Sequence, residues 1–190
     1  MFGWFAQTSP LICRLATVVP AQRQWLRISP LRLLHQLPTL GCVLYVPTRQ
    51  VAPTDEPCVA GVLLAQRELE PVLQTRWLAA ASAITEDGPR EWLECLDGHG
   101  QLRARLHLLP DTDYLAWDAL LLAGEPAVPP AVPRWRRGFR AAGARVVSFR
   151  QRELGGLRVL DAIEPRLVSP LGREMAQRIA QAEAAVLHGA

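Results

Sequence analysis

Two neighbouring strand-like segments joined by a glycine-containing turn constrain the fold of this chain most strongly. Residues 91–96 and 101–108 flank a four-residue turn that holds two glycines. In the second segment leucine and alanine alternate with Arg103, Arg105 and His107, which is the period-two pattern of a strand. Together they predict an antiparallel β-hairpin.

A short helix and two further strands are expected before this hairpin. Ser29 and Pro30 match an N-cap and a first helical position, and the helix that they begin is expected to stop at Pro38. The run 41–46 is compact, apolar and rich in β-forming residues, so we expect a strand there. A second strand is expected over 58–65, with a glycine inside it that indicates a bulge.

The other segments follow from proline, glycine and charge signals. Residues 67–83 fit either a strand around Pro71 followed by a helical turn, or one longer helix broken at Pro71. The remaining expected elements are a helix over 114–122 capped within 111–113 and ended by Gly124, a proline-rich linker, a basic helix over 135–142, a strand over 145–150 and a helix over 171–187.

These elements predict an α+β fold. Strands cluster centrally, helices lie toward both ends of the chain, and no regular βαβ alternation is present, so the sheet is expected to be antiparallel with helices packed on it. The expected organisation is a poorly assigned segment 1–28, a sheet and helix domain 29–122, a proline-rich linker 123–133, and a region 134–190 that packs on the same domain.

Hydropathy and cysteine usage indicate a cytoplasmic protein. No uncharged apolar run reaches the roughly 18 residues that a membrane span needs. Pro10 and Pro20 interrupt the apolar start, and its first charge is Arg14, so it does not resemble a signal peptide. The four cysteines form no CxxC pair and are expected to be free thiols.

The basic residues are unusual because all 21 are arginine. The formal net charge of +3 is too small to imply a nucleic-acid partner. Seven arginines and no acidic residue occupy 134–152, and this patch is expected either to be solvated or to dock on acidic parts of this chain or of a partner.

Catalytic motifs are missing from the sequence. The four histidines form no HxH, HExxH or HxxxH pair, and neither a GxSxG elbow nor a phosphate-binding loop occurs. The acidic residues near the hairpin fall in turn and cap positions, which are common structural roles. We therefore expect no metal centre and a protein that is not an enzyme.

Three segments, taken in order, resemble a known family. They are LLHQLPTLGCVLYVPTR at 33–49, LQTRW at 73–77, and the hairpin turn LECLDGHG at 93–100 followed by DTDYLAW at 111–117. Their order and spacing over residues 29–122 resemble one unit of the HemS-like hemin transport and hemin-degrading factors of bacteria. Because the chain has room for one such unit, the resemblance implies a homodimer or a protein partner.

The resemblance also implies heme, bound at a sheet–helix cleft through a histidine and nearby arginines. The histidines that this family carries after its first strand and after a later tryptophan have no counterpart in residues 50–61 and 136–142. By elimination the axial candidates are His107 and Tyr114, since iron accepts imidazole or tyrosinate. The arginines expected near the propionates are Arg103, Arg105, Arg136, Arg137 and Arg140.

Two functions are therefore expected from the sequence. The first is a heme-binding or heme-trafficking accessory protein of iron utilisation, which requires a cleft holding an imidazole or phenol and two arginines. The second is a non-catalytic interaction or regulatory protein on a degenerate heme-utilisation fold, which requires a filled cleft and an exposed apolar patch. For His107, the plain alternative is an outward position on an exposed strand face.

Overall fold

The fold is a mixed α+β structure built on one large sheet. The computed structural model describes residues 22–49, 61–86, 88–128 and 138–189. Within these ranges the strands are β1 (Gln22–Arg27), β2 (Gly41–Pro47), β3 (Val62–Leu64), β4 (Trp77–Thr85), β5 (Gly88–Leu96), β6 (Leu102–Thr112), β7 (Glu125–Pro126), β8 (Ala144–Leu154), β9 (Leu157–Ile163) and β10 (Leu187–His188).

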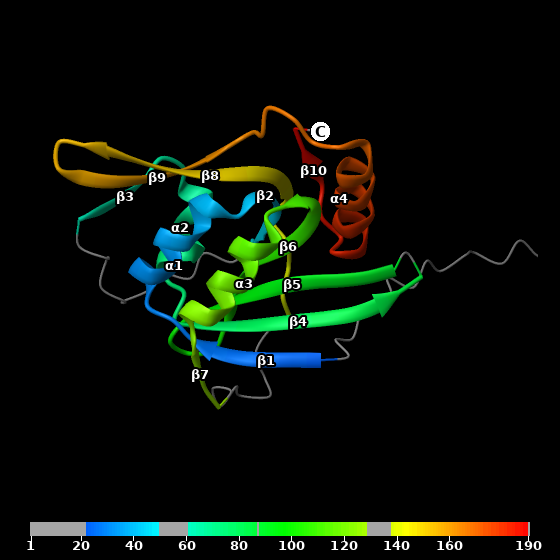
Figure 1. Cartoon of the computed structure of the whole chain (residues 1–190), viewed down its shortest axis with the longest axis horizontal. Coiled ribbons are helices and arrows are strands. Elements are labelled where there is room, and N and C mark those ends of the chain that lie inside the picture. Colours follow the sequence, from blue (N-terminus) through cyan, green and yellow to red (C-terminus); the bar gives the residue numbers. More distant parts are fainter. Residues whose placement is uncertain (1–21, 50–60, 87, 129–137, 190) are drawn as a thin grey trace, which may run out of the picture.

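The strands pair in the order β3-β9-β8-β2-β6-β5-β4-β1-β7, and β10 pairs with the start of β8 (Figure 1). Every pairing is antiparallel except β3 with β9 and β10 with β8, which are parallel. The expected hairpin is present as β5 and β6, and His107 lies opposite Trp92 in its register.

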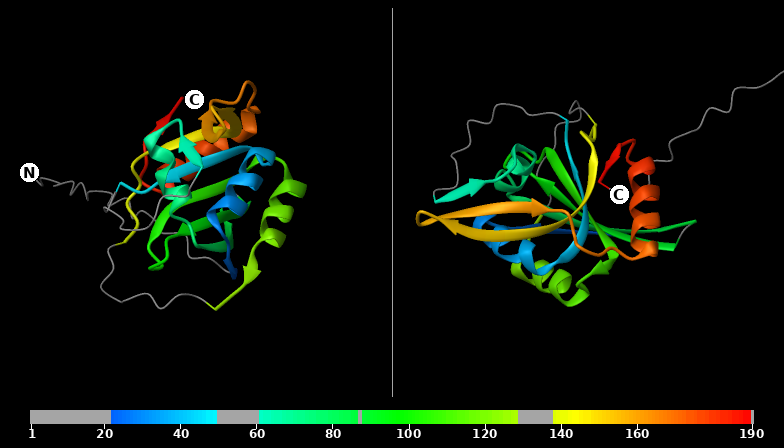
Figure 2. Two further views of the ribbon diagram at one scale, coloured as in Figure 1. Left: turned by 90° about the vertical axis from the view of Figure 1, so that its left-hand side faces the viewer. Right: turned by 90° about the horizontal axis from the view of Figure 1, so that it is seen from above.

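Helices cover both faces of the sheet. They are α1 (Pro30–Gln36), α2 (Glu70–Leu73), α3 (Tyr114–Ala123) and α4 (Pro170–Ala182), with short 3₁₀ turns at Leu37–Thr39 and Arg67–Leu69. α1, α2 and α3 pack on the larger hydrophobic core, whereas α4 packs on the opposite face over a smaller cluster (Figure 2). Both faces of the central strands are therefore buried.

Local signals explain where the helices begin and end. The Ser29 side chain accepts a hydrogen bond from the Arg32 amide, and Pro30 follows it in the first turn of α1. Asp113 caps α3 by accepting from the Ala116 amide, and that helix ends at Gly124. Both helices confirm their sequence predictions.

Several expected elements differ from the structure. Strand β1 lies within the unassigned segment 1–28. Residues 67–83 form a helical turn followed by β4, so both structures expected there, a strand before a helical turn and one longer helix, are wrong. The described part of the expected basic helix, 138–142, is not helical, and Ala141 forms an isolated bridge to Thr48. The final helix is shorter than expected and gives way to β10.

Some expected features lie outside the described residues. These are most of the segment 1–28, the start of the expected strand 58–65, the proline-rich stretch beyond 128, and residues 135–137 of the expected basic helix. Among the described helices none has the length and apolar character needed to cross a membrane.

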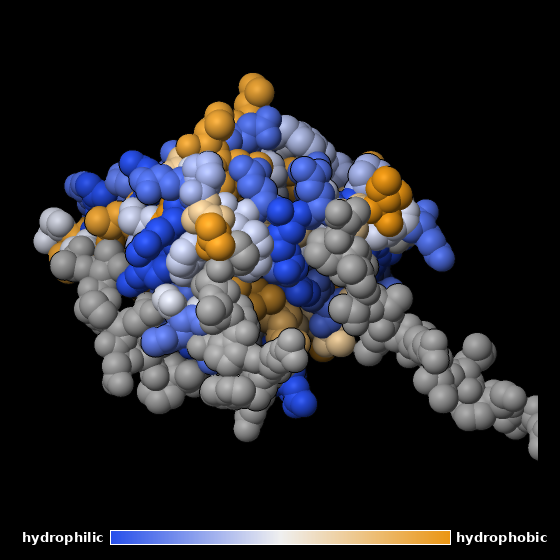
Figure 3. Space-filling model, turned by 90° about the horizontal axis from the view of Figure 1, so that it is seen from below, coloured by the Kyte–Doolittle hydropathy of each residue, from blue (hydrophilic) through white to orange (hydrophobic). Residues whose placement is uncertain are grey.

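The surface is mixed in character. Figure 3 shows hydrophilic residues over much of the described part of the lower face, with hydrophobic residues in separated groups. The large apolar side chains with the greatest exposure belong to several different elements. This part of the surface therefore offers no single broad apolar area.

Candidate functional site

A cavity lies between the β5–β6 hairpin and the C-terminal half of α4. Its volume is about 360 Å³, within the usual range for small-molecule sites. We call it the α4 cavity. It is lined by Arg90, Trp92, Arg105, His107, Gly138, Phe139, Ile179, Ala182, Glu183 and Ala184.

His107 forms part of the wall of this cavity and is almost fully buried. Alternation along β6 turns its side chain toward α4, and the residue is 4% exposed. Its imidazole stacks on Trp92, with ring centroids 6.0 Å apart and planes inclined by 30°. The outward, exposed position considered for His107 from the sequence is therefore wrong, because α4 covers this face of the strand.

Among the described residues, the polar group beside the buried imidazole is the Glu183 carboxylate. Neither ring nitrogen of His107 makes a hydrogen bond within the described residues, although Nε2 lies 3.5 Å from Glu183 Oε1. Burial lowers the pKa of His107 below its ordinary value; Glu183 opposes this shift, and Arg105 and Arg90 add to it. A neutral imidazole is the form that ligates a metal ion.

Arg105 connects two carboxylates beside His107. Its guanidinium lies 2.6 Å from Glu183 Oε2 and 3.1 Å from Glu94 Oε1. Glu94, itself nearly buried, also pairs with Arg23 at 3.0 Å. Burial alone would raise the pKa of Glu183, but contacts with His107 and Arg105 lower it below its ordinary value. The Glu183 carboxylate therefore stays charged and holds Arg105 in place.

Aromatic rings form the other walls of the cavity. The Arg105 guanidinium lies over the Phe139 ring, 4.8 Å from its centroid, which is a cation–π distance. Trp92 closes the side formed by β5. The α4 cavity thus combines flat apolar walls, a neutral nitrogen and cationic groups, a set suited to a planar ligand that carries carboxylates.

The other residues singled out from the sequence lie elsewhere. Arg103 is buried and pairs with Asp97 at 2.7 Å. Tyr114 is 54% exposed at the start of α3, on the face of the sheet opposite α4. Arg140 is exposed, and its carbonyl accepts a hydrogen bond from the Arg49 amide. Arg136 and Arg137 lie outside the described residues.

The structure thus brings together His107 and Arg105 and leaves the other described candidates apart. Sequence reasoning missed Trp92, Phe139 and Glu183 as lining residues. Trp92 could have been found, because hairpin register places it opposite His107. No sequence pattern pointed to Glu183, since its position depends on how α4 packs on the sheet. Within the described ranges no three histidine, cysteine, aspartate or glutamate side chains group as a metal site.

Comparisons with known proteins found partial structural likenesses. No family model matches the chain, and no curated protein matches its sequence. The heme-degrading enzyme ChuS of Escherichia coli O157:H7 superposes with a TM-score of 0.43 and 13% identity over 62% of this chain. A structure of ChuS described as an E. coli heme oxygenase gives 0.44 and 16% over 59% of this chain.

Holo-PhuS, a heme-binding protein from Pseudomonas aeruginosa, gives a TM-score of 0.38 and 17% identity over 63% of this chain. The matched regions cover 40%, 38% and 39% of the three larger chains, less than half of each. These structures are of the heme-handling kind that the motifs in residues 29–122 resemble. The likeness is distant, so the functional assignment depends on the chemistry of the α4 cavity.

Proposed function

We propose that this chain is a heme-binding accessory protein of heme and iron utilisation, and that heme binds in the α4 cavity. The observation that carries this proposal is the buried His107, whose neutral imidazole has no hydrogen-bond partner for either ring nitrogen within the described residues. Buried polar groups are normally satisfied, so an unsatisfied one at a cavity wall is a candidate ligand-binding group.

The chemical types of the residues around the cavity match the parts of a heme group. Heme would supply an iron centre that accepts imidazole nitrogen, and His107 is the imidazole available here. Trp92 and Phe139 would face the flat macrocycle. Arg105 would pair with a propionate, in exchange for one of its present contacts with Glu183. We infer a binding and transfer role in the cytoplasm.

A hemin titration followed by difference spectroscopy tests the proposal. We expect a saturable Soret shift near one hemin per chain in the wild type, because one neutral imidazole faces one cavity. His107→Ala should abolish the shift or weaken hemin affinity at least about tenfold, which corresponds to about 1.4 kcal/mol. His35→Ala is the matched control, since that histidine is exposed on the surface of α1 and contacts Arg158.

Two results would refute heme binding at this site. One is a wild-type spectrum no different from that of hemin mixed with an unrelated protein. The other is an unchanged Soret shift in His107→Ala. Ala182→Trp offers an independent check, because Ala182 lines the cavity at the end of α4 and a bulky side chain there should exclude hemin.

A second candidate is an interaction or regulatory protein on a degenerate heme-utilisation fold. The outer face of α3 favours it, because Leu115 and Leu122 are 81% and 85% exposed on a helix that is apolar on nearly all sides. Light scattering would test it. An assembly that dissociates in Leu115→Ser/Leu122→Ser, in a chain that shows no saturable hemin response, would favour this function over heme binding.

A further inference from the structure

A second hollow lies on the other face of the sheet, near α2. One part, of about 500 Å³, is bordered by Tyr45, Leu69, Arg145, Val147, Ala162 and His188, among others. A neighbouring part, of about 360 Å³, includes Arg49, Arg67, Glu70 and Gln74 in its lining. The two parts share Pro47, Glu68 and Ala142, so we treat them as one groove and call it the α2 groove.

The floor of the α2 groove is apolar and fixed. Tyr45, Leu69 and Val147 belong to the main core and are almost fully buried. The Tyr45 hydroxyl donates a 2.6 Å hydrogen bond to the Glu68 carbonyl, and burial raises the pKa of that phenol well above its ordinary value. The floor is therefore preformed, each of its side chains shows only an edge to the groove, and its polar atom is already satisfied.

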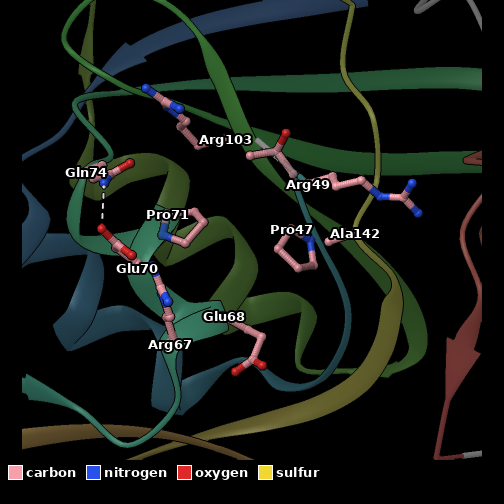
Figure 4. A pocket seen from close by; sticks show the side chains of 10 residues that line it. Pro47, Arg49, Arg67, Glu68, Glu70, Pro71, Gln74, Arg103 and Ala142 are labelled. Atoms are coloured by element: carbon pink, nitrogen blue, oxygen red, sulfur yellow. Dashed lines mark hydrogen bonds between the residues drawn. The ribbon is translucent and has the colours of Figure 1, made fainter. Parts of the chain in front are cut away.

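The rim of the groove carries three arginines whose side chains have no partner in the described part of the chain. Arg145 is half-buried, and its guanidinium makes no ion pair or hydrogen bond within the described residues; the same holds for Arg49 and Arg67 at the other part of the groove. Figure 4 shows Arg67, Glu68 and Glu70 on the helical side and Arg49 on the strand side. Glu70 already accepts a hydrogen bond from Gln74.

Side chain and backbone are closely packed at the end of the groove next to β10. A Cβ added to Gly143 would lie 3.0 Å from His188 Nε2, so the imidazole lies close against the backbone there. His188 and Arg145 sit opposite each other where β10 pairs with β8. An arginine beside an apolar floor is a common arrangement for binding an amphipathic anion.

We propose that the α2 groove binds a small carboxylic acid with an apolar body. The body lies on Tyr45, Leu69 and Val147, and the carboxylate pairs with Arg145. Arginine suits this role because its planar guanidinium matches a carboxylate, and a half-buried guanidinium gains more from that pair than an exposed one does. This site is distinct from the α4 cavity, which faces the other side of the sheet.

Calorimetric titration with 1-naphthylacetate tests the proposal, and its neutral amide, 1-naphthylacetamide, is the matched probe. We expect one binding event per chain for the acid and at least about tenfold weaker binding for the amide, because a charge-assisted pair is lost. Arg145→Gln should weaken binding of the acid by about the same factor. Arg152→Gln, an exposed arginine on the same strand, should leave it unchanged.

Two filling variants separate the groove from the α4 cavity. Ala142→Trp should block 1-naphthylacetate and leave the hemin response intact, because Ala142 is exposed and lines only the groove. Ala182→Trp should block the hemin response and leave binding of 1-naphthylacetate intact. The proposal is overturned if the wild type binds no 1-naphthylacetate, if Arg145→Gln binds it as the wild type does, or if Ala182→Trp rather than Ala142→Trp abolishes binding.

Discussion

At the scale of single residues, the buried pair Asp97–Arg103 anchors the hairpin that carries His107. Asp97 Oδ1 accepts hydrogen bonds from the His99 and Gln101 amides, and Oδ2 accepts from Arg103 Nε at 2.8 Å. One carboxylate therefore accepts hydrogen bonds from two backbone amides of the turn and from a buried guanidinium. The pair closes the turn of the hairpin, and the strand register beyond the irregularity at Cys95/Leu96 sets His107 opposite Trp92.

Removing this carboxylate should be costly. Both side chains are almost fully buried, at 0% and 6% exposure, so Asp97→Ala would strand the charge of Arg103 away from water. We expect a loss of about 3–5 kcal/mol in the free energy of unfolding, measured by urea denaturation. Asp118→Ala on exposed α3 should change it by less than about 0.5 kcal/mol. Equal effects of the two variants would contradict this assignment.

Stability should also depend on the protonation of His107. Its pKa is lowered in the folded protein, so the unfolded chain binds more protons as the pH falls. The contribution of neutral His107 to the free energy of unfolding is therefore fully present above the pKa of histidine in the unfolded chain, about 6.5. It is lost as the pH falls below that value. We expect the urea concentration at the unfolding midpoint to decrease as the pH is lowered from 7 to 5.5.

The groups that face His107 help to define the pH experiment. They are Glu183, Arg105 and Arg90. The Glu183 pKa is lowered from its ordinary value of 4.5, so its own contribution is lost only in a more acidic window. His107→Gln should reduce the change in the urea midpoint between pH 7 and pH 5.5. The loss of stability at more acidic pH, which comes from Glu183, should remain. A wild-type midpoint that is constant over that range would contradict burial of a neutral imidazole.

At the scale of elements, α4 is attached to the sheet by an unusual contact at its first turn. Ser169 caps the helix by accepting from the Gly172 amide, and the Asp111 carboxylate at the end of β6 binds both the amide and the hydroxyl of Ser169. A Cβ on Gly172 would overlap Asp111 Oδ2. This glycine is therefore required by packing, although it lies within a helix.

This contact predicts a reversal of the usual effect of glycine replacement. Gly→Ala in a helix normally stabilises by up to about 1 kcal/mol, but Gly172→Ala should destabilise by about 1–3 kcal/mol through overpacking. In an Asp111→Ala background the same change should be neutral or stabilising. A double-mutant cycle from urea unfolding measures the coupling between the two residues. Additive effects of the two substitutions would show that they do not meet.

The elements that were predictable from the sequence are those fixed by local signals. The hairpin, strand β2 and helices α1 and α3 carry alternation, caps or stop residues of their own. β1 carries none, because its six residues gain their structure by pairing with β4 and β7. Residues 138–142 have a basic and aromatic composition compatible with a helix, yet the backbone pairs with Thr48 and Pro47 instead.

The candidate site was predictable only in part for the same reason. The residue type and the strand of His107 and Arg105 could be read from the alternation. Their burial could not, because it depends on α4, whose Glu183 is far away in the sequence and contacts them only in the fold. Charge pattern alone also gave no reason to separate Arg103, which binds Asp97, from Arg105, which faces the cavity.

At the scale of the whole molecule, one sheet separates two cores of unequal size. The larger core joins α1, α2 and α3 to the sheet, and the smaller one holds α4 and β10 against the opposite face. A helix held by a small apolar cluster and a few polar contacts should open more easily than the strands beneath it. Opening of α4 would expose the α4 cavity and give a ligand its route to His107.

Native-state hydrogen exchange should therefore resolve α4 as a separate unit. We expect its amides to exchange through an opening of lower free energy than that of β2 and β6. If hemin binds only the closed form, a free hemin concentration 100 times its dissociation constant should raise that opening free energy by about 2.7 kcal/mol. The increase should be missing in His107→Ala, which serves as the control. If α4 exchanges only with global unfolding in the wild type, the cavity has no such entrance, and the route to His107 must lie elsewhere.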